Sequence, residues 1–287
     1  MKLQGSLEYL NVYIWAILII AVVLIVMVQL NIFNPNFWAA KQQPGSCSII
    51  RIQLGGASLH CTGNYLIPEF VAQFDGQSSY ITLPSNTPFN YGSAPSTICG
   101  WANLFGIPGR YGTNDGYSWI MAYGTGSNSE ARFVGFTSTA LDGGGYGSDI
   151  LYPTSMSKYL NNWNFFCSTY DGSDAKLYIN GALVAGPSPF SWHAAKSVAY
   201  IGKQVNSLSE YFYGQLADIQ VYNTSLSSNN IQSLYLEGIG GAPIDFRYLA
   251  GWWPLNGDSN DYSGLGNSGI ATNIIFTSNW YGSYVQP

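Results

Sequence analysis

Residues 163–172, WNFFCSTYDG, and residues 176–181, KLYING, determine the predicted fold class of this chain. Aromatic residues together with Thr, Ile and Leu fill both stretches, which is typical of β-strands. Each stretch ends in a strong turn signal, Asp171-Gly172 in the first and Asn180-Gly181 in the second. We therefore predict two strands, Trp163–Tyr170 and Lys176–Ile179, with a turn after each.

Strand-like runs recur on both sides of this pair. They are Glu69–Phe74, Tyr80–Leu83, Thr97–Leu104, Tyr117–Tyr123, Arg132–Ser138, Val198–Ile201, Gly214–Tyr222 and Leu249–Leu255. Turns such as Asn114-Asp115-Gly116 and Asp142-Gly143-Gly144-Gly145 separate them. Only Ser225–Glu237 has helical spacing, and it begins with an N-cap serine. Many strands and one short helix predict a mainly β fold, a β-sandwich.

The composition supports this prediction and excludes some partners. Aromatic residues make up 16% of the chain and charged residues only 9%, with a net charge of −5. A disordered chain would have high charge and few aromatic residues, which is the opposite pattern. Because Lys and Arg form no cluster, we do not expect nucleic acid to be a partner.

Several segments resemble the laminin G-like, concanavalin A-like jelly roll. The resemblance covers about residues 68–240 and rests on segments 74–81, 99–101, 163–172, 176–181 and 214–223. A further element, residues 251–258 with 261–264, opens the domain in that family but comes last here. We therefore expect one jelly-roll domain over residues 47–287, circularly permuted, with residues 249–281 completing the sandwich. The alternative is a truncated second domain, although some 40 residues cannot bury a core alone.

The N-terminus predicts a different element. Residues 4–10 read QGSLEYL, and residues 12–33 contain no charged residue. As a helix, residues 12–33 would be about 33 Å long, enough to cross the hydrocarbon core of a bilayer. We predict a long apolar helix over residues 4–33, followed by a linker over residues 34–46 whose two prolines stop the helix.

This N-terminus resembles that of archaeal type IV pilins with a Gln-x-Ser-x-Glu-x-x-x-Leu signal. Gln4, Ser6 and Glu8 match, while Val12 stands in place of Leu. The resemblance implies a leader over residues 1–3, cleaved before Gln4, and a filament core built from the helix. It also implies that Glu8 neutralises the new amine of Gln4 or of a neighbouring subunit, since a carboxylate among apolar helices is costly unless paired. The alternative is a plain membrane anchor.

The cysteines favour an exported, disulfide-bonded domain. Cys47 and Cys61 bracket two short strands joined by the turn signal Leu54-Gly55-Gly56-Ala57, so a disulfide closing this hairpin is natural. Cys99 and Cys167 each lie inside an apolar strand. They are either bridged across neighbouring strands or buried thiols.

One structural calcium ion is implied by the jelly-roll resemblance. Asp218 lies where related sandwiches place a calcium ligand, and the permuted fold would bring Asn256, Asp258 and Asp261 near it. Such a loop supplies the carboxylate, amide and carbonyl oxygens that calcium prefers. The alternative is ordinary turn chemistry, which we also expect for Asp75-Gly76 and Asp171-Gly172.

Catalysis is not expected. Laminarinase-type relatives of this fold carry a Glu-x-Asp-x-x-Glu run on one strand, and this sequence has none. Glu130, Glu210 and Glu237 are isolated in the sequence, and the aspartates lie mainly in turns. With only His60 and His193, no Ser/His/Asp arrangement is supported.

Two functions remain open. The first is a self-assembling subunit of a type IV pilus-like filament at the cell surface, inserted in the membrane as a precursor and displaying a lectin-like domain for adhesion. The second is a monomeric, membrane-anchored adhesin that binds glycans or surface proteins. The candidate sugar contacts are ring side chains in or beside loops, since sugars pack on flat apolar rings: Tyr111, Tyr117, Tyr146, Trp192 and Trp280. Asn223 begins the only Asn-x-Ser/Thr sequon and is a candidate glycosylation site.

Overall fold

The computed structural model describes residues 19–22, 46–52, 56–62, 67–106, 116–206 and 210–287. The chain divides into two compact units, Met1–Gln43 and Pro44–Pro287. In the first unit, residues 19–22 are helical, and the rest of the predicted helix over residues 4–33 lies outside the described residues. Within the described ranges, no helix is long and apolar enough to span a membrane.

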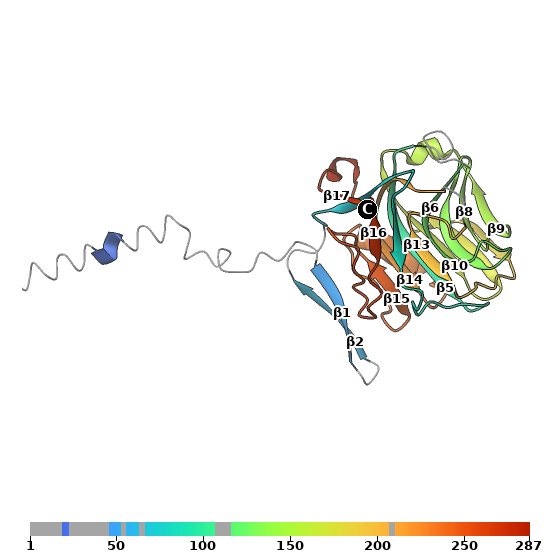
Figure 1. The fold of residues 1–287 in the computed structure, drawn as a ribbon, viewed down its shortest axis with the longest axis horizontal. Helices are drawn as coiled ribbons and strands as arrows, with labels where there is room; N and C mark the ends of the chain where they lie inside the picture. Colours follow the sequence, from blue (N-terminus) through green and yellow to red (C-terminus); the bar gives the residue numbers. More distant parts are fainter. Residues whose placement is uncertain (1–18, 23–45, 53–55, 63–66, 107–115, 207–209) are drawn as a thin grey trace, which may run out of the picture. The chain divides into compact units, whose positions relative to one another are not determined.

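The second unit is a sandwich of two antiparallel sheets (Figure 1). The first sheet has the order β12 (Ala182–Pro189), β11 (Asp174–Ile179), β10 (Trp163–Tyr170), β5 (Ser96–Leu104), β14 (Tyr213–Tyr222), β3 (Val71–Asp75) and β17 (Ile275–Thr277), and β15 (Leu249–Trp253) also pairs with β14. The second sheet has the order β16 (Ile270–Thr272), β4 (Tyr80–Leu83), β13 (Val198–Ile201), β6 (Tyr117–Gly124), β7 (Ala131–Thr137), β8 (Ala140–Gly144) and β9 (Asp149–Pro153). The predicted mainly β sandwich is confirmed.

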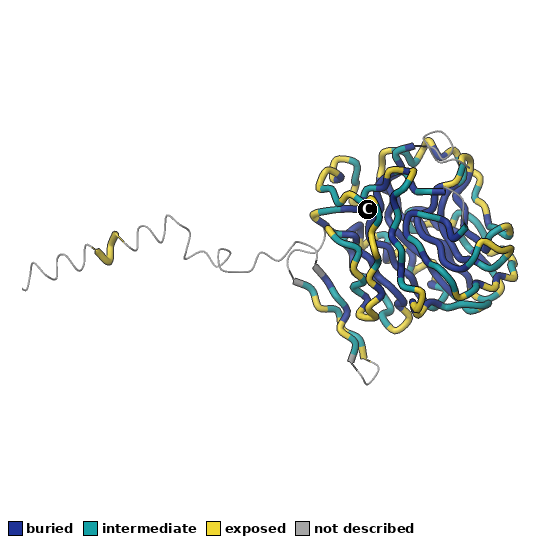
Figure 2. The backbone as a smooth tube through the Cα atoms, in the orientation of Figure 1, coloured by how far each residue is buried: buried dark blue, intermediate teal, exposed yellow. Residues whose placement is uncertain are grey.

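Every residue of strand β10, the stretch that decided the predicted fold, is buried. Buried stretches of the sandwich are dark blue in Figure 2. Successive side chains of a strand point to opposite faces. Phe166 and Tyr170 therefore enter the core between the two sheets, whereas Phe165 and Cys167 enter a second apolar cluster on the outer face of the first sheet. This double burial explains why its apolar residues form a continuous run instead of alternating with polar residues.

The second cluster is covered by two elements outside the sheets. Helix α3 (Ser228–Glu237) contributes Ile231 and Leu234, and the Ser227 side chain caps it by accepting a hydrogen bond from the Asn230 N–H at 3.2 Å. The short two-stranded sheet of β1 (Ser46–Ile52) and β2 (Gly56–Thr62) contributes Ile49. The predicted helix is thus confirmed, with its cap at the third residue of the expected segment.

The last forty residues supply strands to both sheets. β15 pairs with β14, β17 pairs with β3, and β16 pairs with β4 of the second sheet. Trp253 and Leu255 from this segment are fully buried in the main core. Residues 249–281 are therefore integral to the sandwich, while the permutation relative to the family order stays a prediction.

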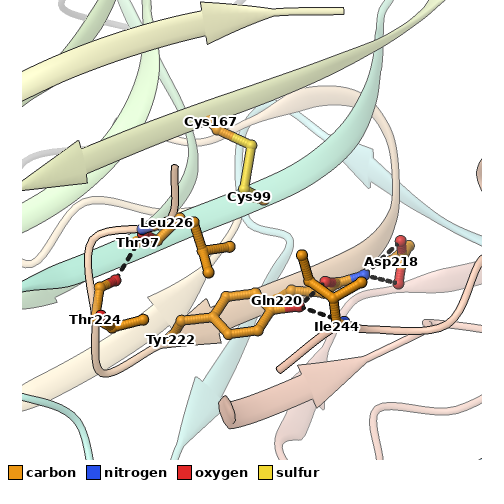
Figure 3. Close-up of a disulfide and its surroundings, with 9 residues drawn as sticks. All are labelled: Thr97, Cys99, Cys167, Asp218, Gln220, Tyr222, Thr224, Leu226 and Ile244. Carbon is orange, nitrogen blue, oxygen red and sulfur yellow. Dashed lines mark hydrogen bonds between the residues drawn. A yellow bond between two sulfur atoms is a disulfide. The ribbon is translucent and has the colours of Figure 1, made fainter. Parts of the chain in front are cut away.

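Both disulfides are present. Cys47 and Cys61 are register partners in the β1–β2 hairpin and are joined as predicted. Cys99 of β5 and Cys167 of β10 are also register partners and are bonded, which decides between the two alternatives for this pair (Figure 3).

One predicted turn is wrong. Residues 142–145, Asp142-Gly143-Gly144-Gly145, were expected to form a turn, but residues up to Gly144 belong to strand β8. Its partners on the two sides are β7 and β9. The glycines serve packing here, because a Cβ at Gly143 would collide with Leu177 and one at Gly145 with Trp192.

Candidate functional site

The outer face of the second sheet carries an aromatic cluster. Trp119 of β6 and Phe133 of β7 are nearly fully buried there, with ring centroids 4.5 Å apart in an edge-to-face arrangement. The ring of Tyr117, two residues before Trp119 on the same strand face, stacks on Trp119 at 5.7 Å with an interplanar angle of 7°. Tyr117 is 37% exposed, so this stack runs from the packed face of the sheet to solvent.

Glycines on the neighbouring strands make room for these side chains. Gly135 is the register partner of Trp119, and a Cβ at this position would collide with the indole ring. Gly144 is the register partner of Phe133 and of Asp149, and a Cβ there would collide with both side chains. Gly144 of β8 therefore makes room for large side chains on the outer face of the sheet, whereas Gly143 makes room for Leu177 on the core side.

A pocket of about 320 Å³ opens beside this stack. Strands β6, β7, β8 and β9, the turn between β8 and β9, and Gln204 and Glu210 between β13 and β14 build it (β6, β8 and β9 are labelled in Figure 1). We call it the acidic pocket, and it is lined by Tyr117, Trp119, Phe133, Asp142, Tyr146, Gly147, Asp149, Gln204 and Glu210. Its volume lies at the lower end of the range for small-molecule sites.

Three carboxyl groups belong to residues that line the acidic pocket. Asp142 of β8 is 2% exposed, and its Oδ1 atom has no hydrogen-bond partner among the described residues. The same is true of Oδ1 of Asp149, from β9. Glu210 is held by the chain itself, because its Oε2 accepts hydrogen bonds from Trp119 Nε1 at 2.8 Å and from Asn206 Nδ2 at 3.2 Å.

Burial raises the pKa of two of these carboxyl groups. The pKa of Asp142 lies well above its usual range because burial disfavours the charged form and because Asp149 and Glu210 repel it. Burial also raises the pKa of Asp149, although backbone N–H groups of the preceding turn act in the opposite direction. Glu210 is isolated in the sequence and Asp142 was predicted to lie in a turn, and the fold places both in the wall of one pocket with Asp149.

The predicted sugar contacts divide into three groups. Tyr117 and Tyr146 line the acidic pocket. Trp192 and Trp280 are buried packing residues, at 1% and 4% exposure, and Trp192 stacks on Phe190 with ring centroids 5.0 Å apart. Tyr111 lies outside the described residues, as do Gln4 and Glu8 of the predicted assembly motif.

Both carboxylate oxygens of Asp218, the first predicted calcium ligand, already accept hydrogen bonds from the chain. Both of its carboxylate oxygens accept from Gln220 Nε2, at 3.0 and 2.9 Å, and Oδ1 also accepts from Trp252 Nε1 at 2.7 Å (Figure 3 shows Asp218 and Gln220). The side chain is buried, and this burial raises its pKa to about 7. A carboxyl group in this state is a poor ligand for a hard cation, which needs ionised oxygens free to coordinate.

The other three predicted ligands are held by the chain in the same way. Asp261 accepts from three backbone N–H groups, those of Trp252, Ser263 and Asn267, at 2.9–3.0 Å. Asp258 accepts from Asn260 and Tyr262, and Asn256 Oδ1 accepts from the Phe70 N–H at 2.8 Å. In the described residues no three His, Cys, Asp or Glu side chains are grouped to hold a metal. The donor set therefore does not fit the calcium site that the resemblance implied.

The structure also shows the hydrogen bonds of the two predicted turn aspartates and of the sequon asparagine. Asp75 accepts hydrogen bonds from the backbone N–H groups of residues 77–79, which holds its pKa below the usual range, and Asp171 accepts from those of residues 173 and 174. Both are turn residues, as expected. Asn223 donates from Nδ2 to the Pro88 carbonyl at 2.7 Å, so its amide is engaged in the folded chain. Its glycosylation stays a prediction.

Comparisons with known proteins agree with this architecture. A laminin G-type family model, described as the concanavalin A-like lectin/glucanases superfamily, matches residues 75–232, more than half of the chain. A structure from Bacteroides ovatus with a proposed role in carbohydrate binding superposes with a TM-score of 0.55 at 16% identity, over 77% of this chain. The chain spans 62% of the length of that structure. This likeness shows the fold.

Two further structures are more distant. A SAP-like pentraxin from Limulus polyphemus has a TM-score of 0.49 at 14% identity, covering 73% of this chain and 94% of its own. The CBM40 module of a Ruminococcus gnavus IT-sialidase has a TM-score of 0.44 at 13% identity, covering 60% and 99%. No curated protein matches the chain in sequence.

Proposed function

We propose that this chain, which belongs to the concanavalin A-like lectin/glucanases superfamily, binds glycans in the acidic pocket. The observation that carries the proposal is the Tyr117–Trp119 stack at the pocket, whose outer ring is exposed. A sugar ring packs its C–H face on such a ring while its hydroxyl groups bind nearby polar atoms. The pocket offers those atoms from Asp142, Asp149 and Gln204.

The carbohydrate-binding role proposed for the Bacteroides ovatus structure supports this function by analogy of fold. We further propose that the chain binds glycans without cleaving them. The sequence lacks the Glu-x-Asp-x-x-Glu run of the hydrolytic relatives, in which the acids stand on one strand. The acids of the pocket come instead from β8, β9 and the segment before β14.

The test is a glycan-binding assay on the full chain in detergent, with Tyr117→Ala as the probe. The variant should weaken binding about tenfold, or about 1.4 kcal/mol, through loss of one stacking contact. Tyr248→Ala is the matched control, since Tyr248 is similarly exposed at 42% but does not line the pocket. Equal binding by the two variants, or no glycan binding at all, would refute the proposed site. Release of reducing ends from a bound glycan would refute the non-catalytic function.

We also propose that this domain is displayed on a surface filament, with residues 34–287 outside the cell. The sequence supports this through Gln4, Ser6 and Glu8 ahead of the uncharged residues 12–33. The two disulfides are consistent with export. Electron microscopy of the purified protein should show helical fibres, and Glu8→Ala should abolish them. Uniform detergent-soluble monomers would instead favour the membrane-anchored adhesin.

A further inference from the structure

Two aspartates in the wall of the acidic pocket have incomplete hydrogen bonding among the described residues. Asp142 and Asp149 each keep one carboxylate oxygen without a hydrogen-bond partner among the described residues. No Lys, Arg or His belongs to the described residues that line the pocket. Lys203, the neighbour of Gln204 in the sequence, directs its amine to a separate group of tyrosine rings, at 4.9 Å from Tyr80.

An unpartnered, buried carboxyl group is expensive, because the protein must either desolvate the charge or hold a proton on it. Asp142 is in this state while facing Asp149 and Glu210, and Tyr117 and Tyr146 are the other ionisable residues that line the pocket. A bound cation would remove the penalty. Its positive charge would offset the repulsion between the carboxyl groups. It would also supply a hydrogen-bond donor for Oδ1 of Asp142.

The walls of the pocket indicate which kind of cation fits. Trp119, Phe133, Tyr117 and Tyr146 form much of the lining. A hard divalent ion requires six to eight oxygen ligands and gains nothing from aromatic rings. The ammonium group of an organic ligand interacts favourably with both kinds of side chain. Aromatic faces attract cations, and carboxylates accept N–H hydrogen bonds. The same sheet already holds the Lys203 amine over the rings of Tyr80, Tyr200 and Tyr211.

We infer that the acidic pocket selects a glycan unit that carries a free primary amine, an amino sugar without an acetyl group. Asp142 and Asp149 accept hydrogen bonds from its ammonium group, and the Tyr117–Trp119 stack supports its ring. This inference rests on the proposed glycan binding and names the chemistry of the preferred ligand. An acetylated amine is neutral, so it would leave both carboxyl groups uncompensated.

Calorimetry on the full chain in detergent tests this with three trisaccharides of the same β-1,4 linkage. They are the glucosamine, N-acetylglucosamine and glucose trimers, which differ only at the C2 substituent. The glucosamine trimer should bind about tenfold or more tightly than the other two, as expected for hydrogen bonds between charged groups. Equal or tighter binding of a neutral trimer would overturn the inference while leaving glycan binding intact. Failure of all three to bind would count against the proposed function itself.

Two variants test whether Asp142 and Asp149 cause the preference for the glucosamine trimer. Asp142→Asn and Asp149→Asn should each reduce the advantage of the glucosamine trimer at least several-fold, and Glu237→Gln, an exposed control on α3, should not. If the buried Asp142 variant does not fold, Asp149, which is only half-buried, still decides the matter. An unchanged preference in a folded variant would overturn the inference. Hexylamine binding as tightly as the glucosamine trimer would also overturn it, because the ligand would then be an amine and not a sugar.

Discussion

Replacing Asp218 by Asn should change how the stability of the domain depends on pH. Asp218 lies at a bulge in β14, where the register shifts between Ala217 and Gln220, and its φ angle is 51°. The groups that bind its carboxyl are neutral donors, Gln220 Nε2 and Trp252 Nε1. Asn tolerates positive φ values as well as Asp does, so Asp218→Asn removes the ionisation without new backbone strain.

The direction in which stability changes with pH follows from the raised pKa of Asp218. Burial raises the pKa of Asp218 from 3.8 in the unfolded chain to about 7 in the fold. The folded state thus holds the proton more tightly, and its stability is greatest below pH 4 and falls as the pH rises toward 7. Each pKa unit corresponds to about 1.4 kcal/mol, so the whole change amounts to about 4 kcal/mol. In a domain of this size that corresponds to about 10 °C in melting temperature.

Thermal unfolding between pH 3.5 and pH 7 measures this effect. The variant should gain stability relative to the wild type by about 4 kcal/mol as the pH rises over that interval. Some pH dependence will remain in the variant, because Asp142 and Asp149 also have raised pKa values. Asp174→Asn, at the partly exposed start of β11, is the control. A wild type and an Asp218→Asn variant whose melting curves shift in parallel with pH would falsify the argument.

Two further predictions concern covalent and metal stabilisation. Replacing Cys99 and Cys167 together by Ala should lower the free energy of unfolding by about 4 kcal/mol, the chain-entropy value for closing a loop with a sequence separation of 68. Denaturant titration measures this, and a loss below about 1 kcal/mol would contradict the loop argument. Adding EDTA should leave the melting temperature unchanged, because Asp218, Asp258 and Asp261 bind donors of the chain itself; a drop of several degrees would contradict this and restore the calcium hypothesis.

The sequence predicted those strands that carry a dense apolar pattern. Trp163–Tyr170, for example, was predicted with the bounds that β10 has in the structure. Three of the unpredicted strands, β12, β16 and β17, have weaker patterns. β12 contains Gly186 and Pro187 and lies at the edge of its sheet, where few of its side chains are buried. β16 and β17 have three residues each, too few for a periodic pattern to be recognised.

The acidic pocket could not be predicted from the sequence for a related reason. Its acids come from three elements, and Asp142 lay in a run of glycines that local rules assign to a turn. Those glycines are required by residues far along the chain or on other strands, such as Leu177 against Gly143. Local propensity therefore gave the wrong element at the position that matters most for the site. Tyr117 and Tyr146 were still predicted as contacts, because their place beside loops is a local property.

The two outer faces of the sandwich differ in what covers them, and this difference argues for the position of the site. The outer face of the first sheet packs against α3 and the β1–β2 hairpin, and the Arg51 side chain fastens the hairpin by donating to the carbonyl groups of Ser263 and Leu249 at 3.0 and 2.8 Å. The aromatic side chains on that face pack against these elements and are buried. On the second sheet, comparable rings line a pocket together with Asp142 and Asp149, each of which has a buried carboxylate oxygen without a partner among the described residues. Such groups reduce the stability of the free domain. A ligand that supplied their missing partners would offset that cost, so we expect binding on this face.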